Sequence, residues 1–129
     1  MDTPQDDPPP QGPEAEYLAA LRDGRFCYQR TATGRAVFPP RLAAPGDGAA
    51  LEWAQSAGRG TVHAVTEQPQ KPPAPARVFA ILDMDEGFRL FSRVDATGPV
   101  QIGQRLIARI ATEADPPHVY FVPEAPQDV

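Results

Sequence analysis

Arginine is the residue type in this sequence best suited to bind an anion. Arg59 lies between Gly58 and Gly60, so its guanidinium group and the neighbouring backbone could contact an anion together. Arg89 and Arg93 are four residues apart in a predicted strand, where this spacing places both on one face. Guanidinium groups bind phosphates and carboxylates through paired hydrogen bonds. In the alternative interpretation, this is a solvated face with ion pairs to Asp83, Asp85 or Asp95.

Serine and histidine side chains do not form a recognisable catalytic motif. A nucleophilic site could be drawn from Ser56 or Ser92 with His63 or His118, but no nucleophile-elbow motif surrounds either serine. His63 falls in an alternating segment and is predicted to belong to a barrel strand. His118 follows two prolines and is predicted to lie in a solvent-facing loop. We therefore expect no catalytic residues.

The remaining groups that could bind a metal are too few or wrongly spaced. Asp83, Asp85 and Glu86 lack the pattern of a calcium loop and are typical of a solvated hairpin turn. Cys27 and His63 would supply too few strong ligands for zinc. Cys27 is predicted to be a small buried apolar residue.

Charge is concentrated at the start of the chain. The 129 residues carry a net charge of −5, and residues 1–16 hold five acidic residues and no basic one. The rest of the chain holds 12 acidic and 12 basic residues and is neutral. A neutral body with an acidic, proline-rich tail is a poor non-specific binder of nucleic acid.

Several features favour a cytoplasmic protein. The single cysteine allows no intrachain disulfide. The first residues are acidic and proline-rich, where a signal peptide needs basic residues and an apolar run. No apolar stretch approaches the length of about 20 residues that a membrane span requires.

One short helix is predicted, from Pro13 to Asp23. Pro13 suits a first helical turn, and Tyr17, Leu18 and Leu21 share one face. A helix this short is marginal alone and needs a surface to pack on. Two possibilities remain open, namely packing on the protein's own barrel and docking on a partner.

The rest of the chain is predicted to be β-structure. Alternating or apolar segments bounded by glycine and proline predict strands, with glycines 58 and 60 forming a bend or bulge in one long strand. The predicted strands are residues 25–30, 51–57 continuing through 61–67, 77–83, 88–94, 104–112 and 118–122. Five or six strands with no βαβ repeat predict an all-β fold with a small barrel.

Short motifs along residues 16–123 resemble one known family. They are Leu21-Arg22-Asp23-Gly24-Arg25, Phe38-Pro39-Pro40-Arg41, residues 53–62, residues 82–90, Ile102-Gly103 and Phe121-Val122-Pro123. Their order and spacing resemble the domain of unknown function thirty-five family. This resemblance implies a rubredoxin-like zinc ribbon followed by an OB-fold.

The resemblance also implies that the zinc site is lost. The family's ribbon places two cysteines before the Phe38–Arg41 motif and two after it. The corresponding positions are Arg30, Thr33, Ala44 and Asp47, none of which is cysteine. We expect a degenerate, metal-free ribbon region.

Four regions follow from these patterns. Residues 1–13 are expected to be a disordered acidic tail, since few apolar groups offset the entropy of ordering. Residues 14–50 are expected to hold the helix and the degenerate ribbon, and residues 51–123 the OB-fold. Residues 124–129 are expected to be a second disordered tail.

The family resemblance implies an accessory role in acyl-CoA metabolism. It predicts a non-catalytic subunit that forms a hetero-oligomer with a thiolase-like enzyme, an aldolase or a hydratase and stabilises it or helps complete its acyl-CoA site. Arg59, Arg89 and Arg93 are candidates for contacting coenzyme A held by that partner, and no cofactor of its own is expected. The expected interface residues are Tyr17, Leu18, Leu21, Phe38 and Arg41.

Two alternatives remain, a single-stranded nucleic-acid-binding OB module and, less favoured, a small enzyme. OB-folds bind single strands through exposed aromatic and basic side chains. Here Phe79, Phe88, Phe91 and Tyr120 lie among apolar residues and are predicted to be core. The single lysine and the negative net charge also count against nucleic acid.

Overall fold

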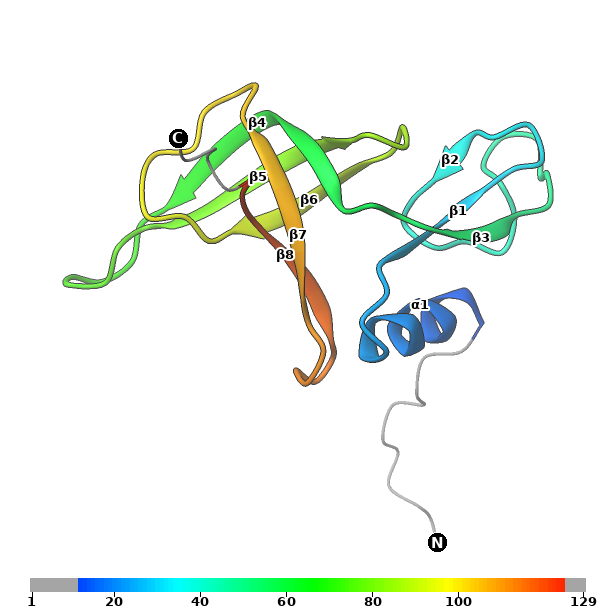
Figure 1. Cartoon of the computed structure of the whole chain (residues 1–129), viewed down its shortest axis with the longest axis horizontal. Helices are drawn as coiled ribbons and strands as arrows, with labels where there is room; N and C mark the ends of the chain where they lie inside the picture. Colours follow the sequence, from blue (N-terminus) through cyan, green and yellow to red (C-terminus); the bar gives the residue numbers. More distant parts are fainter. Residues whose placement is uncertain (1–11, 125–129) are drawn as a thin grey trace, which may run out of the picture.

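The protein consists of one helix and eight strands, seen in a computed structural model that describes residues 12–124 (Figure 1). The two predicted tails, apart from residues 12, 13 and 124, lie outside the described residues. The elements are α1 (Pro13–Arg22), β1 (Cys27–Arg30), β2 (Ala36–Val37), β3 (Glu52–Gln55), β4 (Arg59–Gln68), β5 (Arg77–Met84), β6 (Arg89–Val94), β7 (Arg105–Ala111) and β8 (His118–Pro123).

Five strands close into a barrel in the order β4-β5-β6-β8-β7. The neighbours are antiparallel except β6 and β8, which are parallel. The long strand β4 closes the barrel, because residues 59–61 pair with β7 while residues 60–68 pair with β5. The fold is mainly β with an OB-type barrel, which confirms the predicted fold class.

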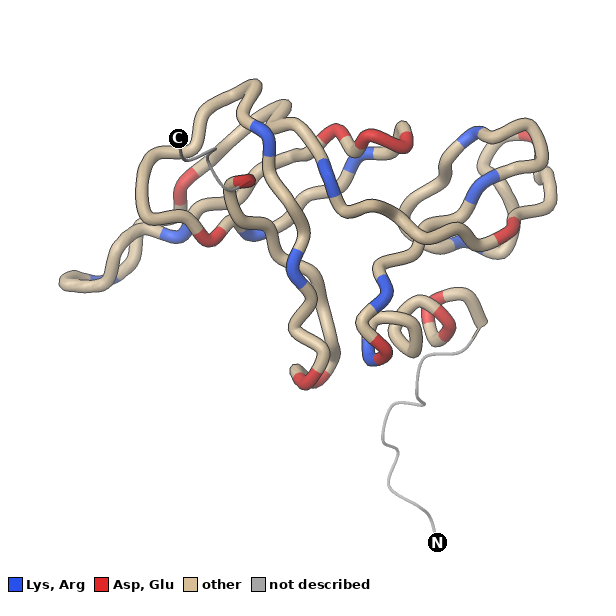
Figure 2. The backbone as a smooth tube through the Cα atoms, in the orientation of Figure 1, with Lys and Arg blue, Asp and Glu red and all other residues tan. Residues whose placement is uncertain are grey.

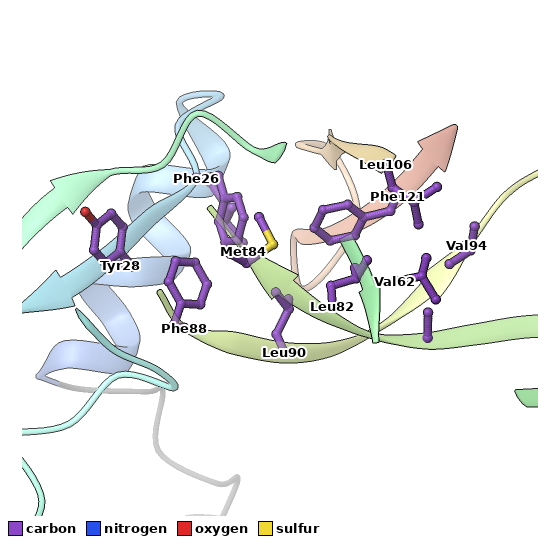
Figure 3. Packing of buried hydrophobic residues seen from close by; sticks show 12 residues of the cluster. Phe26, Tyr28, Val62, Leu82, Met84, Phe88, Leu90, Val94, Leu106 and Phe121 are labelled. Atoms are coloured by element: carbon purple, nitrogen blue, oxygen red, sulfur yellow. The ribbon is translucent and has the colours of Figure 1, made fainter. Parts of the chain in front are cut away.

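Alternating side chains fill the barrel. In β5 and β6 the even-numbered residues from Val78 to Val94 point inward, and the odd-numbered residues face outward. Leu82, Leu106 and Phe121 are fully buried and meet in the centre of the core (Figure 3). The predicted small apolar role of Cys27 is also confirmed, since its side chain is buried on β1.

Residues 51–57 differ from the prediction, which made them the first half of a barrel strand. Strand β3 instead pairs with β1, in a separate three-stranded sheet of order β2-β1-β3. The connection between the two sheets runs through Gly58. Its φ of +77° ends the pairing of β3 and redirects the backbone into β4. The barrel therefore starts at Arg59 rather than at residue 51.

Helix α1 packs on the protein's own strands β1 and β8, in agreement with the first of the two possibilities left open by the sequence. Leu21 is fully buried in the shared core, and Tyr17 and Leu18 pack against that core while partly exposed. The helix ends one residue earlier than predicted, followed by Gly24 with a φ of +81°. Within residues 12–124, no helix is long and apolar enough to cross a membrane.

The two glycines of the bend are required for different reasons. Gly58 has a positive φ in the connection between β3 and β4, whereas Gly60 lies where β4 and β5 pass too closely for a side chain. The irregularity in the β4–β5 register falls between Val62 and Ala64, not at the two glycines as predicted. A Cβ on Gly60 would lie 2.8 Å from Met84 Sδ and 3.1 Å from the backbone oxygen of Asp83. Gly60→Ala should therefore lower the free energy of unfolding by about 1–3 kcal/mol, the usual cost of overpacking.

Urea unfolding measures this effect, and Gly98→Ala is the matched control because a Cβ there meets nothing within 4 Å. An unfolding midpoint unchanged by Gly60→Ala, or lowered equally by both variants, would contradict the close approach of β4 to β5.

The packing of the helix can be tested through Tyr17. Burial raises the pKa of Tyr17 from 10.0 to about 12, with a smaller contribution from Cys27. Between these two values the unfolded chain loses the Tyr17 proton and the folded chain keeps it, so stability falls as the pH rises. Above pH 10 the unfolding midpoint of Tyr17→Phe should therefore fall less than that of the wild type. The control variant Tyr120→Phe should retain the part of the fall that comes from Tyr17. An equal fall in wild type and Tyr17→Phe would show that the Tyr17 hydroxyl is solvated.

Candidate functional site

Phe88 joins the N-terminal sheet to the barrel. It lies directly before β6 and is 5% exposed. Its ring stacks on Tyr28 and on Phe38, each with ring centroids 5.1 Å apart, and meets the edge of Phe26 at 6.2 Å (Figure 3). Offset-stacked and edge-to-face pairs are the favourable aromatic geometries. The Phe38–Arg41 motif is thus held against the barrel.

The turn between β5 and β6 makes a second attachment. Glu86 accepts hydrogen bonds from the Ser56 hydroxyl at 2.9 Å and the Ala57 backbone N–H at 2.8 Å. The Ser56 hydroxyl in turn accepts one from the Gly58 N–H at 2.9 Å. These bonds fix the connection between β3 and β4. The N-terminal sheet is thus attached to the barrel both through Phe88 and through Glu86.

Two of the three arginine candidates have carboxylate partners within the chain. Arg59 forms an ion pair with Glu124 at 2.6 Å, and Arg89 forms one with Asp83. Nearby, Arg105 donates hydrogen bonds of 2.7 and 2.8 Å to Asp85, which hold the pKa of that carboxyl below its usual value. The predicted alternative of a solvated, ion-paired face therefore holds for Arg89.

Arg93 differs from the other two. Its side chain is on the outer face of β6, and its guanidinium makes no ion pair or hydrogen bond with any residue between 12 and 124. Asp95 lines the same hollow but lies beyond ion-pair distance of the Arg93 guanidinium. Arg93 is thus the candidate still able to bind an external carboxylate or phosphate.

Phe91 contradicts its prediction as a core residue. It lies on the outer face of β6 with 62% of its surface exposed and stacks on Phe79 of β5, with centroids 5.4 Å apart and planes 4° apart. Phe88 is buried as predicted, while Tyr120 is only partly buried. The sequence did indicate this exposure, because the alternation that places Arg89 and Arg93 on one face of the strand also places Phe91 between them on that face.

A groove runs from this exposed pair to the helix. It has a volume of about 380 Å³, and its lining comes from α1, the Phe38 loop, β5, β6 and the start of β8. Tyr17, Phe38, Phe79 and Phe91 supply aromatic walls, and Arg93 and His118 supply polar groups. Tyr17 and Phe38 also touch each other edge to face, with centroids 5.7 Å apart. The N-terminal part, through α1 and the Phe38 loop, and the barrel therefore contribute to one surface.

The other predicted interface residues have structural contacts. Leu21 is buried and gives a partner no surface in this conformation, which corrects its proposed place in a docking stripe. Leu18 is partly exposed beside the core. Arg41 is anchored through its backbone, since Gln29 accepts from its N–H at 2.7 Å and donates to its carbonyl at 2.8 Å.

The segment predicted to be a degenerate ribbon is held by hydrogen bonds at two of the four positions that the resemblance equates with zinc ligands. Thr33 shares a hydrogen bond of 3.0 Å with Thr31, and Asp47 accepts from Arg35 at 3.3 Å and from the Ala49 N–H at 3.0 Å. The other two positions are Arg30, which lies 3.9 Å from Glu52, and the buried Ala44. Among residues 12–124, no three His, Cys, Asp or Glu side chains gather as metal ligands.

The serine and histidine candidates are not brought together. Ser92 is buried and donates only weak hydrogen bonds to backbone carbonyls, and Ser56 bonds to Glu86. His63 is on β4 beside Asp83, with Nδ1 3.5 Å from its carboxylate. His118 is exposed at the start of β8. In the described part of the chain, no serine is hydrogen-bonded to a histidine.

Comparisons with known proteins agree with this fold. Residues 53–111 match the model of the family described as the C-terminal OB-fold domain of ChsH2. A solved chain from the Ltp2-ChsH2(DUF35) aldolase is similar to this protein with a TM-score of 0.73 and 22% sequence identity. The match covers 91% of this chain and 98% of that chain, so it includes the N-terminal sheet as well as the barrel. No curated protein matches the sequence.

The buried Gln29 should be required for the stability of the ribbon region. Gln29→Leu keeps a similar volume but leaves the N–H and carbonyl of Arg41 without their partners. We expect a loss of about 1–3 kcal/mol in the free energy of unfolding, the usual cost of such unpaired groups. The measurement is the urea midpoint, with Gln101→Ala, in an exposed loop, as the control. A midpoint equal to that of the control would show that water replaces the Gln29 contacts.

Proposed function

We propose that this chain, an OB-fold protein of the domain of unknown function thirty-five family, is a non-catalytic accessory subunit of an aldolase-type enzyme of acyl-CoA metabolism. Its partner would be a thiolase-like aldolase, with a hydratase as a related possibility. In such a hetero-oligomer the partner holds the catalytic residues and the acyl-CoA. The small chain stabilises the partner and helps to complete its acyl-CoA site in the cytoplasm.

The observation that carries this proposal is the extent of the likeness to the chain from the Ltp2-ChsH2(DUF35) aldolase. The likeness spans 98% of that chain, including both the N-terminal sheet and the barrel. The arrangement shared with that chain is therefore the whole two-part unit, which supports a role for the joined unit rather than for an isolated barrel.

The arrangement of reactive side chains supports a non-catalytic role. A nucleophile needs a base within hydrogen-bond reach, and residues 12–124 present no such serine–histidine pair. The chain is proposed to act without a cofactor of its own. Of the three coenzyme A candidates, Arg59 and Arg89 already have carboxylate partners. Among the described residues, Arg93 is therefore the candidate that keeps an unpaired guanidinium for use in the complex.

Binding of single-stranded nucleic acid is the second candidate, and the exposed Phe79–Phe91 stack favours it. Bases stack on such aromatic pairs, but tight binding also needs a positive groove that follows the phosphates. Figure 2 shows basic and acidic segments interspersed over the barrel instead of a continuous basic stripe. The accessory role is the better supported of the two.

Co-expression tests the proposed function. The full chain should be produced together with a thiolase-like aldolase from its own host, and the two should elute together in size-exclusion chromatography. Since a subunit that binds only the folded state of its partner stabilises it by mass action, the melting temperature of the partner should rise with the concentration of this chain. Separate elution and an unchanged melting temperature, together with salt-sensitive binding to an oligonucleotide, would contradict the accessory role.

A further inference from the structure

We propose that the enzyme partner docks on the outer face of strands β4, β5 and β6, with Phe91 at its centre, rather than on the helix stripe of Tyr17, Leu18 and Leu21. This inference rests on the proposed function and names the surface that performs it. The Phe91 face consists of Ala64, Thr66, Phe79, Ile81, Phe91 and Arg93.

The strand register makes this face continuous. Ile81 pairs with Ala64 on one side and with Phe91 on the other, so these three form one row across the sheet. In the next row Phe79 lies between Thr66 and Arg93. A shallow hollow of about 100 Å³ lies over the apolar members of both rows. Directly opposed side chains on one face form a single contact surface, here apolar with an arginine at its edge.

The groove beside Phe91 extends this face onto the N-terminal part of the protein. Phe79 and Phe91 line both the shallow hollow and the groove of about 380 Å³ that reaches Tyr17 and Phe38. A partner segment lying across the face would therefore contact the Phe38 loop as well as the barrel. This explains how Tyr17 and Phe38 can take part in an interface while Leu21 remains core.

The unpaired positive charge at the edge of the face indicates which kind of partner it binds. On the described residues Arg59, Arg89 and Arg105 each have a carboxylate partner, whereas Arg93 at the edge of the apolar rows has none. An arginine beside exposed aromatic rings is typical of the residues that dominate protein interfaces. The complementary surface is an apolar segment of the partner enzyme with an aspartate or glutamate placed to meet Arg93.

The same charges disfavour the other occupants. A nucleic acid strand would need several free cations along the face, but Arg89 is neutralised by Asp83, and of the arginines on the outer side of β5 and β6 only Arg77 and Arg93 have no carboxylate partner among the described residues. A second copy of the chain would have to offer a carboxylate to Arg93. The two rows contain none, and Asp83 in the adjacent row is already paired with Arg89. A protein partner of opposite charge fits better.

Two substitutions test the assignment in the complex of the full chain with the thiolase-like aldolase of its host. Phe91→Thr keeps a strand-forming residue but removes the exposed ring, and Arg93→Glu reverses the free charge. Each should raise the dissociation constant of the complex about tenfold or more, as expected for a central interface residue. Isothermal titration calorimetry measures it, and melting temperatures show that both variants fold.

Matched controls lie off the face. Ile102→Thr removes a side chain that is 70% exposed in the loop before β7, and Arg109→Glu reverses an exposed charge on β7. Both should leave the dissociation constant unchanged. If the wild type binds and Phe91→Thr and Arg93→Glu bind equally well, the docking face is refuted while the accessory role stands.

The remaining outcomes overturn the assignment in other ways. Failure of the wild type to bind the thiolase-like protein would refute both the accessory role and the docking face. Binding of oligo(dT) that Phe91→Thr abolishes would assign the face to nucleic acid. A dimer of the free chain in light scattering that Phe91→Thr converts to a monomer would assign it to a second copy.

Discussion

The burial of Phe88 between two sheets is the interaction on which the rest of the structure depends. Its ring contacts Tyr28 of β1, Phe26 directly before β1 and Phe38 in the loop after β2, while its backbone leads into barrel strand β6. Aromatic pairs of this kind contribute about 0.5–1.5 kcal/mol each beyond the burial of their surface. Phe88 therefore determines how the two parts are oriented.

Fixing that orientation creates the surface to which we assign function. The inward residues of β5 and β6 are used for the core, so Phe79, Phe91 and Arg93 are left facing outward beside Tyr17 and Phe38. In the N-terminal part, hydrogen bonds from Gln29 hold Arg41, and Asp47 holds Arg35 and Ala49. The N-terminal part can thus serve as a rigid side of the groove.

Much of the architecture could be predicted from the sequence, because glycine, proline and alternation mark strands directly. The barrel strands from 61 onward were predicted to within a few residues. The pairing of residues 52–55 with β1 could not be, because strand pairing depends on tertiary packing that local alternation does not encode. The sequence prediction placed Phe91 in the core because its neighbours are apolar, although strict alternation between Arg89 and Arg93 places it on the outer face of the strand.

The ion pair of Arg59 with Glu124 could not be predicted, because it depends on a contact between residues distant in sequence.

Hydrogen–deuterium exchange of the free chain and of its complex with the thiolase-like partner tests the central claim most directly. Backbone amides exchange more slowly where a partner orders or covers them. Our account predicts that complex formation slows exchange in peptides covering residues 77–84 and 89–94 and in the loop around Phe38. Protection confined to α1 or to the far strand β7, with β5 and β6 unchanged, would contradict it.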